Sequence, residues 1–180
     1  MGSTEKVLSE CGIWRINLLM KVLVTIGSMV EKKFTRLFQI IDELCEEGIL
    51  DGKNVVAQVG FDNYNSKFYK CFDMIADEEF KNIINKCDLV IAHAGTGTVI
   101  SSIKRGKKVI IFPRMAQYDE HYDDHQLELA ELFTKQGYVL QARNKEELKK
   151  CILGLDDFTP VPFVSNNENM NKLVIDFIEK

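Results

Sequence analysis

The chain has 180 residues, of which 46% are hydrophobic and 28% charged, and its formal net charge is −4 at pH 7. This is the composition of one soluble globular domain, and a negative chain without a basic run is not expected to bind nucleic acid. No apolar stretch approaches the ~20 residues that a membrane-spanning helix needs, so any membrane association is expected through a surface or a partner.

Hydrophobic patterns predict alternating strands and helices from residue 21 onward. The short apolar runs that predict strands cover residues 21–26, 54–59, 68–75, 89–92, 109–112 and 138–140. The helical spacings cover residues 34–45, 77–86, 96–103, 124–133 and 145–153, with a last helix over 167–179. Asp77 and Asn144 are expected to cap their helices. Strands that alternate with helices imply a Rossmann-like α/β fold, a parallel sheet with helices on both faces.

Residues 1–19 are set apart from this pattern. They are expected to be an N-terminal extension, either the remnant of a tag or a poorly ordered start, and the folded domain is expected over residues 20–180. The five cysteines are widely spaced and odd in number, which favours reduced thiols over a disulfide framework.

Three turns that follow predicted strands contain the residues best suited to chemistry. They are Gly27 with Ser28, the stretch from His93 to Thr98, and the stretch over residues 113–126. The carboxyl ends of parallel strands share one edge of a sheet, and ligands bind there. We therefore expect the three turns to converge on one rim.

The turn from His93 to Thr98 reads H-A-G-T-G-T and opens a predicted helix. Gly95 and Gly97 allow a close backbone approach, and hydroxyls stand where free backbone N–H groups begin the helix. This arrangement favours an anion, most often a phosphate. Taken alone, the turn is also compatible with an ordinary threonine cap, and His93 with a structural histidine.

Several common nucleotide signatures are absent from the sequence. The first strand lacks G-x-G-x-x-G, and neither a P-loop nor a D-x-D motif occurs anywhere in the chain. A nicotinamide dinucleotide enzyme and a P-loop kinase are therefore not expected.

A composite motif in the second half carries a family resemblance. After the H-A-G-T-G-T turn come Gly106, I-I-F-P-R from Ile110 and D-D-H-Q-L-E-L-A from Asp123. These blocks resemble the nucleotide-sugar-binding half of GT-B glycosyltransferases, of the family 28 C-terminal-domain type. The resemblance extends to single-domain subunits: the small subunit of the dolichol-linked N-acetylglucosaminyltransferase, and bacterial exopolysaccharide and capsule glycosyltransferase subunits. It covers residues 20–153, and Pro113 with Arg114 favours the bacterial branch.

The resemblance implies that the glycine-containing turn holds the diphosphate of a UDP-sugar, with His93 beside it, and that Gln126 with Asp124 or His125 contacts the sugar. The implied donor-binding residues are Gly27, Ser28, His93, Gly95, Thr96, Gly97, Thr98, Ser101, Asp124, His125 and Gln126. Many relatives have a glutamate that binds the ribose where this chain has Ser101. A single hydroxyl cannot make that bidentate contact, so the usual ribose recognition is in question.

The implied reaction transfers a sugar from a UDP-sugar, a substrate and not a cofactor, to a polyprenyl-diphosphate-linked saccharide in exopolysaccharide or capsule synthesis. The alternatives are a UDP-N-acetylglucosamine transferase subunit of lipid-linked N-glycan synthesis and a non-catalytic UDP-sugar-binding module. A nucleotide-sugar epimerase is disfavoured because it normally needs both domains in one chain.

No metal is expected for this reaction. His121 and His125 stand four residues apart around Asp124, but the spacing shows no third ligand, which favours two solvated histidines. An inverting transfer needs a base, and His121 is the candidate, unless the other half of the enzyme supplies one. Because a GT-B enzyme has two halves, we expect a membrane-anchored partner subunit that brings the lipid-linked acceptor. The chain would then lie in the cytoplasm, at the inner face of the membrane.

Overall fold

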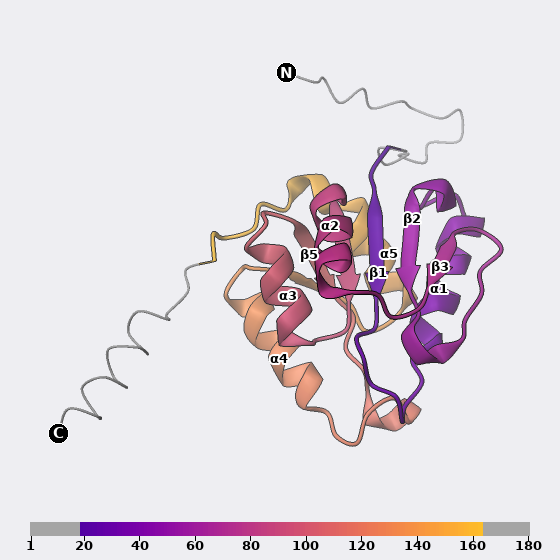
Figure 1. Ribbon diagram of the computed structural model, residues 1–180. Helices are drawn as coiled ribbons and strands as arrows, with labels where there is room; N and C mark the ends of the chain where they lie inside the picture. The colour runs from indigo at the N-terminus through magenta and orange to yellow at the C-terminus, as the bar shows by residue number, and fades with distance from the viewer. Residues whose placement is uncertain (1–18, 164–180) are drawn as a thin grey trace.

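The computed structural model describes residues 19–163 (Figure 1). The helix expected over residues 167–179 lies outside this range, as does the predicted N-terminal extension except for Leu19. The strands are β1 (Val22–Thr25), β2 (Val55–Gln58), β3 (Lys70–Phe72), β4 (Leu89–Ala92), β5 (Lys108–Ile111) and β6 (Leu140–Gln141). The α-helices are α1 (Thr35–Glu46), α2 (Asp77–Lys86), α3 (Thr96–Ile103), α4 (His125–Lys135) and α5 (Lys145–Leu153).

The six strands form one parallel sheet in the order β3-β2-β1-β4-β5-β6. This confirms the predicted Rossmann-like α/β class. The chain proceeds from β1 toward one edge and from β4 toward the other, so the strand order reverses between these neighbours. A crevice opens at the carboxyl ends of strands at such a switch point, and ligands bind there.

Helices cover both faces of the sheet, because side chains of the central strands alternate between two apolar cores. Val22 and Val24 of β1 pack in one core with α1 and α5, whereas Leu23 packs in the other with α2, α3 and α4. Figure 1 shows the same two layers of helices on opposite sides of the sheet. This alternation fixes the register of the strands, because a slip of one residue would move each side chain into the opposite core.

Helix α1 begins without a cap from its own chain segment, and a distant carboxylate supplies one. Asp62, in the short 3-10 helix Gly60–Asp62 that follows β2, accepts a hydrogen bond from the Phe34 backbone N–H at 2.6 Å. The Thr35 hydroxyl donates to the same oxygen at 3.3 Å. The carboxyl ends of β1 and β2 are thereby tied together beside the switch point.

The predicted boundaries differ from the structure mainly at the sheet edges. Strand β3 has three residues instead of the eight expected over residues 68–75, and β6 begins two residues later than predicted. Asn144 caps α5 as predicted by accepting from the Glu147 N–H at 2.9 Å. The prediction for Asp77 was wrong, because it is the first residue of α2 and Ala76 occupies the cap position.

Candidate functional site

The carboxyl ends of β1 and β4 meet around one imidazole ring. His93 follows β4, and its ring lies against Gly27, which follows β1 with a φ of +73°. A Cβ on Gly27 would lie 2.5 Å from His93 Cε1, and one on Gly95 would lie 2.2 Å from His93 Nε2. Both glycines therefore make room for the ring. The sequence did not reveal that Gly95 is needed to make room for the His93 ring.

His93 is held in its neutral form. Burial first, and the nearby Arg114 guanidinium second, lower the pKa of His93 to about 4. Its Nδ1 is buried and has no hydrogen-bond partner among the described residues. At neutral pH the ring therefore has no positive charge to offer an anion and can act only through hydrogen bonds and shape.

The turn over residues 93–98, named here the glycine turn, opens helix α3. Gly95 is at the cap position, no described side chain caps the helix, and its first turn contains no acidic residue. Thr96 and Gly97 are exposed, and a Cβ on Gly97 would meet nothing within 4 Å. The first N–H groups of α3 thus face open space with the positive end of the helix dipole, the arrangement that binds anions.

Ser101 lies one turn further along α3, and its hydroxyl already has a partner. The Arg105 guanidinium donates to Ser101 Oγ at 2.7 Å and to the Ser101 carbonyl at 2.8 Å. A carboxylate at position 101 would carry a negative charge, whereas Ser101 together with the Arg105 guanidinium bonded to it carries a positive charge. The helix therefore presents Arg105 where the family resemblance leads one to expect an acid.

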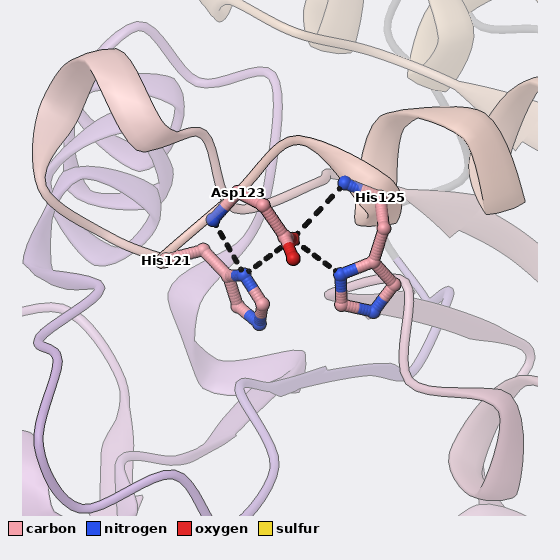
Figure 2. A group of neighbouring side chains, drawn as sticks. All are labelled: His121, Asp123 and His125. Carbon is pink, nitrogen blue, oxygen red and sulfur yellow. Dashed lines mark hydrogen bonds and ion pairs between the residues drawn. The ribbon is translucent and has the colours of Figure 1, made fainter.

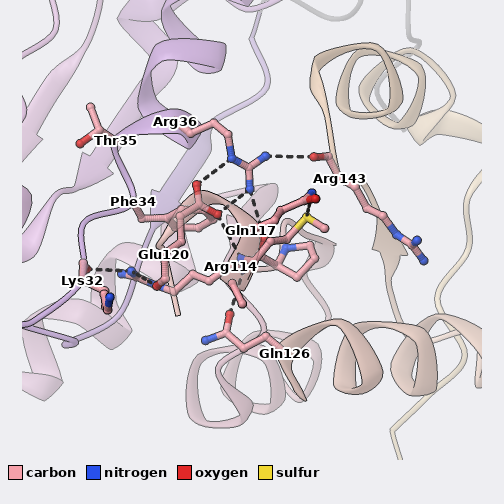
Figure 3. Close-up of polar contacts among 12 residues, drawn as sticks. Lys32, Phe34, Thr35, Arg36, Arg114, Gln117, Glu120, Gln126 and Arg143 are labelled. Carbon is pink, nitrogen blue, oxygen red and sulfur yellow. Dashed lines mark hydrogen bonds and ion pairs between the residues drawn. The ribbon is translucent and has the colours of Figure 1, made fainter. Parts of the chain in front are cut away.

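The segment over residues 113–124, named here the rim loop, follows β5 and is held by a buried arginine (Figure 3). The Arg114 side chain is fully buried, and its Nη1 donates to the carbonyls of Lys32 at 2.9 Å and Glu120 at 3.2 Å. Its Nη2 donates to the Ile26 carbonyl at 3.1 Å. Burial lowers the pKa of Arg114, and the charges of Asp62 and Glu120 oppose that shift. Arg114 thus joins the end of β1 to the rim loop.

A second arginine holds the rim loop from helix α1. Arg36 forms a two-pronged ion pair with Glu120, with Nε–Oε1 and Nη2–Oε2 distances of 2.7 Å each. Its guanidinium lies 4.6 Å from the ring centre of Phe112 and 4.4 Å from that of Tyr118. The Glu120 side chain is only 4% exposed. Such a desolvated, bidentate pair fixes the geometry of both partners.

The three residues expected to contact a sugar differ in their environments. Gln126 is buried, and its Oε1 accepts from the Arg114 backbone N–H at 3.1 Å. Asp124 Oδ1 accepts from the Ala116 N–H at 3.0 Å. Both oxygens therefore support the rim loop, whereas His125 at the start of α4 remains half-exposed.

His121, Asp123 and His125 form a compact cluster where the rim loop enters α4 (Figure 2). Asp123 Oδ1 lies 3.0 Å from His121 Nδ1 and 2.5 Å from His125 Nδ1. Hydrogen bonds from the side chain and backbone of His125 hold the pKa of Asp123 below its usual value. The His–x–Asp–x–His spacing was the available signal for this cluster, but Asp124, and not Asp123, was singled out.

The structure brings Gly27, Ser28, the glycine turn and the rim loop to one end of the sheet, at the carboxyl ends of β1, β4 and β5. Sequence reasoning missed Arg36, Asp62 and Glu120, whose contacts join segments far apart in the chain. Within residues 19–163, no helix is long and apolar enough to cross a bilayer.

The sheet order and the two helical layers define a Rossmann-like α/β domain of the GT-B type, with the N-terminus of α3 at the switch point of the sheet. The sequence profile of the glycosyltransferase family 28 C-terminal domain matches residues 21–179, and the chain belongs to this family.

Named relatives are consistent with this family. The chain is 27% identical over 112 residues to the UDP-N-acetylglucosamine transferase subunit ALG13 of Debaryomyces hansenii, which covers 58% of this chain and 53% of that protein. It is 33% identical over 96 residues to the Saccharomyces cerevisiae protein of the same name, covering 51% and 44% respectively. The match thus spans about half the length of these relatives.

A solved structure has the same fold. The solution structure of ALG13 superposes with a TM-score of 0.54 at 21% identity, covering 89% of this chain and 98% of that one.

Proposed function

We propose that this chain is the donor-binding, catalytic subunit of a two-component glycosyltransferase that uses a UDP-sugar. The observation that carries the proposal is the uncapped, exposed N-terminus of α3 at the switch point of the sheet. Backbone N–H groups and the Thr96 and Thr98 hydroxyls would hold the donor diphosphate there, with Gly97 allowing close approach.

The proposed donor is UDP-N-acetylglucosamine. The relatives reported above are named as UDP-N-acetylglucosamine transferase subunits, which supports this branch over the exopolysaccharide branch that the sequence favoured. The proposed acceptor is a polyprenyl-diphosphate-linked saccharide, as the family resemblance implies. The sugar contacts are assigned to His125 and, through groups not engaged with the rim loop, to Asp124 and Gln126.

The proposed chemistry is an inverting transfer in which the protein's own dipoles stabilise the leaving group. As the bond to the sugar breaks, negative charge develops on UDP, and the N-terminus of α3 stabilises it without reorganising. His121 is the proposed base that accepts the proton of the acceptor hydroxyl. No metal is assigned to the transfer step.

The acceptor side of the site is assigned to a second protein. This domain corresponds to one half of a GT-B enzyme, and the relatives are named subunits. We infer a membrane-anchored partner that recruits the lipid-linked acceptor and holds this chain at the cytoplasmic face of the membrane. Robust sugar transfer by the purified chain, without membranes, would refute the partner requirement.

Calorimetric titration with UDP, UDP-N-acetylglucosamine and UDP-galactose tests the donor site. We expect Thr98→Val to weaken UDP binding by about tenfold, the effect of losing one hydrogen bond to a charged group, and Gly97→Val to weaken it further by blocking the approach. Thr134→Val is the matched control, because that hydroxyl bonds the Ala130 carbonyl on α4. Equal UDP affinity in all variants would overturn the assignment to α3.

A further inference from the structure

The cluster of His121, Asp123 and His125 has the composition of a metal site, although the proposed transfer does not use a metal. The potential ligand atoms of the three residues lie within 4.8 Å of one another. Figure 2 shows both imidazole rings turned toward the carboxylate, with each Nδ1 directed at the same oxygen. Three ligands thus converge from five consecutive residues.

The separations are close to those around a bound ion. Two ligand atoms at tetrahedral angles on a zinc ion, each about 2.0–2.1 Å from it, stand about 3.3 Å apart. The observed distances from Asp123 Oδ1 are 3.0 Å to His121 Nδ1 and 2.5 Å to His125 Nδ1. Side-chain rotations alone can open the shorter distance, because the Asp123 and His125 side chains are 63% and 50% exposed.

The backbone on either side of the cluster is fixed. Glu120, which precedes His121, is paired with Arg36. Gln126, which follows His125, is buried and bonded to the Arg114 N–H, and Asp124 bonds the Ala116 N–H. A cation would therefore bind residues that are already held close together. Little conformational entropy would be lost when it binds.

We propose that His121, Asp123 and His125 form a binding site for a divalent transition metal, of which Zn²⁺ is the expected ion. Two imidazoles and one carboxylate suit zinc, cobalt or nickel, whereas magnesium and calcium prefer oxygen ligands alone. The three residues leave a fourth position for water. This inference does not depend on the proposed glycosyl transfer.

The proposed site has a consequence for catalysis. A metal ion on Nδ1 occupies the lone pair of His121, and the neutral ring then carries its proton on Nε2. A histidine in this form has no free lone pair to accept a proton from an acceptor hydroxyl. If His121 is the base, zinc and the transfer exclude one another, and zinc acts as an inhibitor of the assembled enzyme.

Cobalt absorption spectroscopy on the purified chain tests the site directly. Stoichiometric Co²⁺ should produce the visible bands of a four-coordinate nitrogen and oxygen site, and one equivalent of Zn²⁺ should abolish them. His121→Ala and Asp123→Asn should each weaken binding by more than about tenfold, since changes merely adjacent to metal ligands cost about 10–100-fold. Asp77→Asn, which alters a carboxylate 75% exposed on α2, should bind as the unmodified chain does.

Two results would overturn the site. One is the absence of cobalt bands at one equivalent. The other is a near-ultraviolet cobalt–thiolate band, which would assign the metal to a cysteine. Zinc binding that leaves transfer by the assembled enzyme unchanged would instead keep the metal site and remove His121 as the base, so the two proposals fail separately.

Discussion

The glycine turn and the rim loop both follow central strands at the same end of the sheet, yet they are built in opposite ways. The glycine turn has an uncapped helix start, exposed residues and one neutral ring packed between two glycines. The rim loop is held by two arginines and a buried carboxylate that contact segments far away in the chain. The glycine turn exposes backbone N–H groups, whereas the rim loop is held in place by buried charged side chains.

The difference indicates which changes each region tolerates. In the glycine turn no buried charge is involved, so side-chain changes affect stability mainly through the space they fill. In the rim loop each charged group relies on its partner, because an unpaired buried charge is strongly unfavourable. A comparison of stability changes in the two regions tests this contrast.

The largest effect is expected from Glu120→Gln. The substitution leaves the Arg36 guanidinium without its anionic partner beside Phe112 and Tyr118. Loss of one partner of a buried pair costs about 3–5 kcal/mol. Because the Arg36 side chain is 21% exposed, we expect a loss near the lower end, about 3 kcal/mol, in the free energy of unfolding by urea.

Glu131→Gln provides the matched control. Glu131 pairs with Arg143 at 2.8 Å, but the two side chains are 56% and 42% exposed. Exposed pairs of this kind contribute about 0–1 kcal/mol. If Glu120→Gln costs no more than Glu131→Gln, the rim loop is not held by buried charge and the contrast between the regions fails.

The same contrast explains how much the sequence could predict. The succession of strands and helices along the chain and the glycine turn follow from short-range patterns, namely apolar runs, helical spacing and glycines after strands. Arg36 and Glu120 are separated by 84 positions, and nothing local to either residue indicates that they meet. Asp62 caps α1 from another segment for the same reason. Long-range pairing of charges depends on how loops lie over the sheet, which hydrophobic periodicity does not encode.

The His93 ring illustrates a partial success. Gly95 and Gly97 were predicted to be positions where a Cβ would block a close approach, and the expected reason was a ligand. The structure supplies an internal reason for Gly27 and Gly95, whereas Gly97 remains open. A sequence reveals that space is needed, and only the fold reveals what fills it.

A smaller effect is expected from Gly95→Ala. The new Cβ would lie 2.2 Å from His93 Nε2, and overpacking of this kind costs about 1–3 kcal/mol. The backbone of Gly95, at φ −75° and ψ 115°, is accessible to alanine. In a His93→Ala background the clash with the ring is absent. We therefore expect Gly95→Ala to raise the free energy of unfolding there, by about 0.4–1 kcal/mol.

Gly97→Ala serves as the control for Gly95→Ala. It lies in α3 with open space around it, so it should stabilise the helix by about 0.8–1 kcal/mol. A double-mutant cycle between positions 93 and 95, measured by urea unfolding, isolates the contact. Additive effects would show that the ring does not require the glycine.

The last comparison concerns pH and again separates the two regions. The pKa of His93 is lowered to about 4, from an ordinary value of 6.5, chiefly by burial and then by Arg114. Between pH 6.5 and pH 4 the histidine therefore binds a proton in the unfolded chain but not in the native chain. The free energy of unfolding consequently falls as the pH falls from 6.5 toward 4. Between pH 7 and pH 5 we expect a loss of about 1–2 kcal/mol from this group.

Urea unfolding at pH 7, 6 and 5 of the unmodified chain and of His93→Gln measures this contribution, in a range where most carboxylates stay ionised. The variant should lose less stability across the range, because glutamine does not titrate. Thr134→Val, a change at a hydroxyl that bonds the Ala130 carbonyl and does not titrate, should keep the slope of the unmodified chain. If His93→Gln keeps the slope of the unmodified chain, the pH sensitivity does not come from His93, and the glycine turn is not held together by a neutral ring.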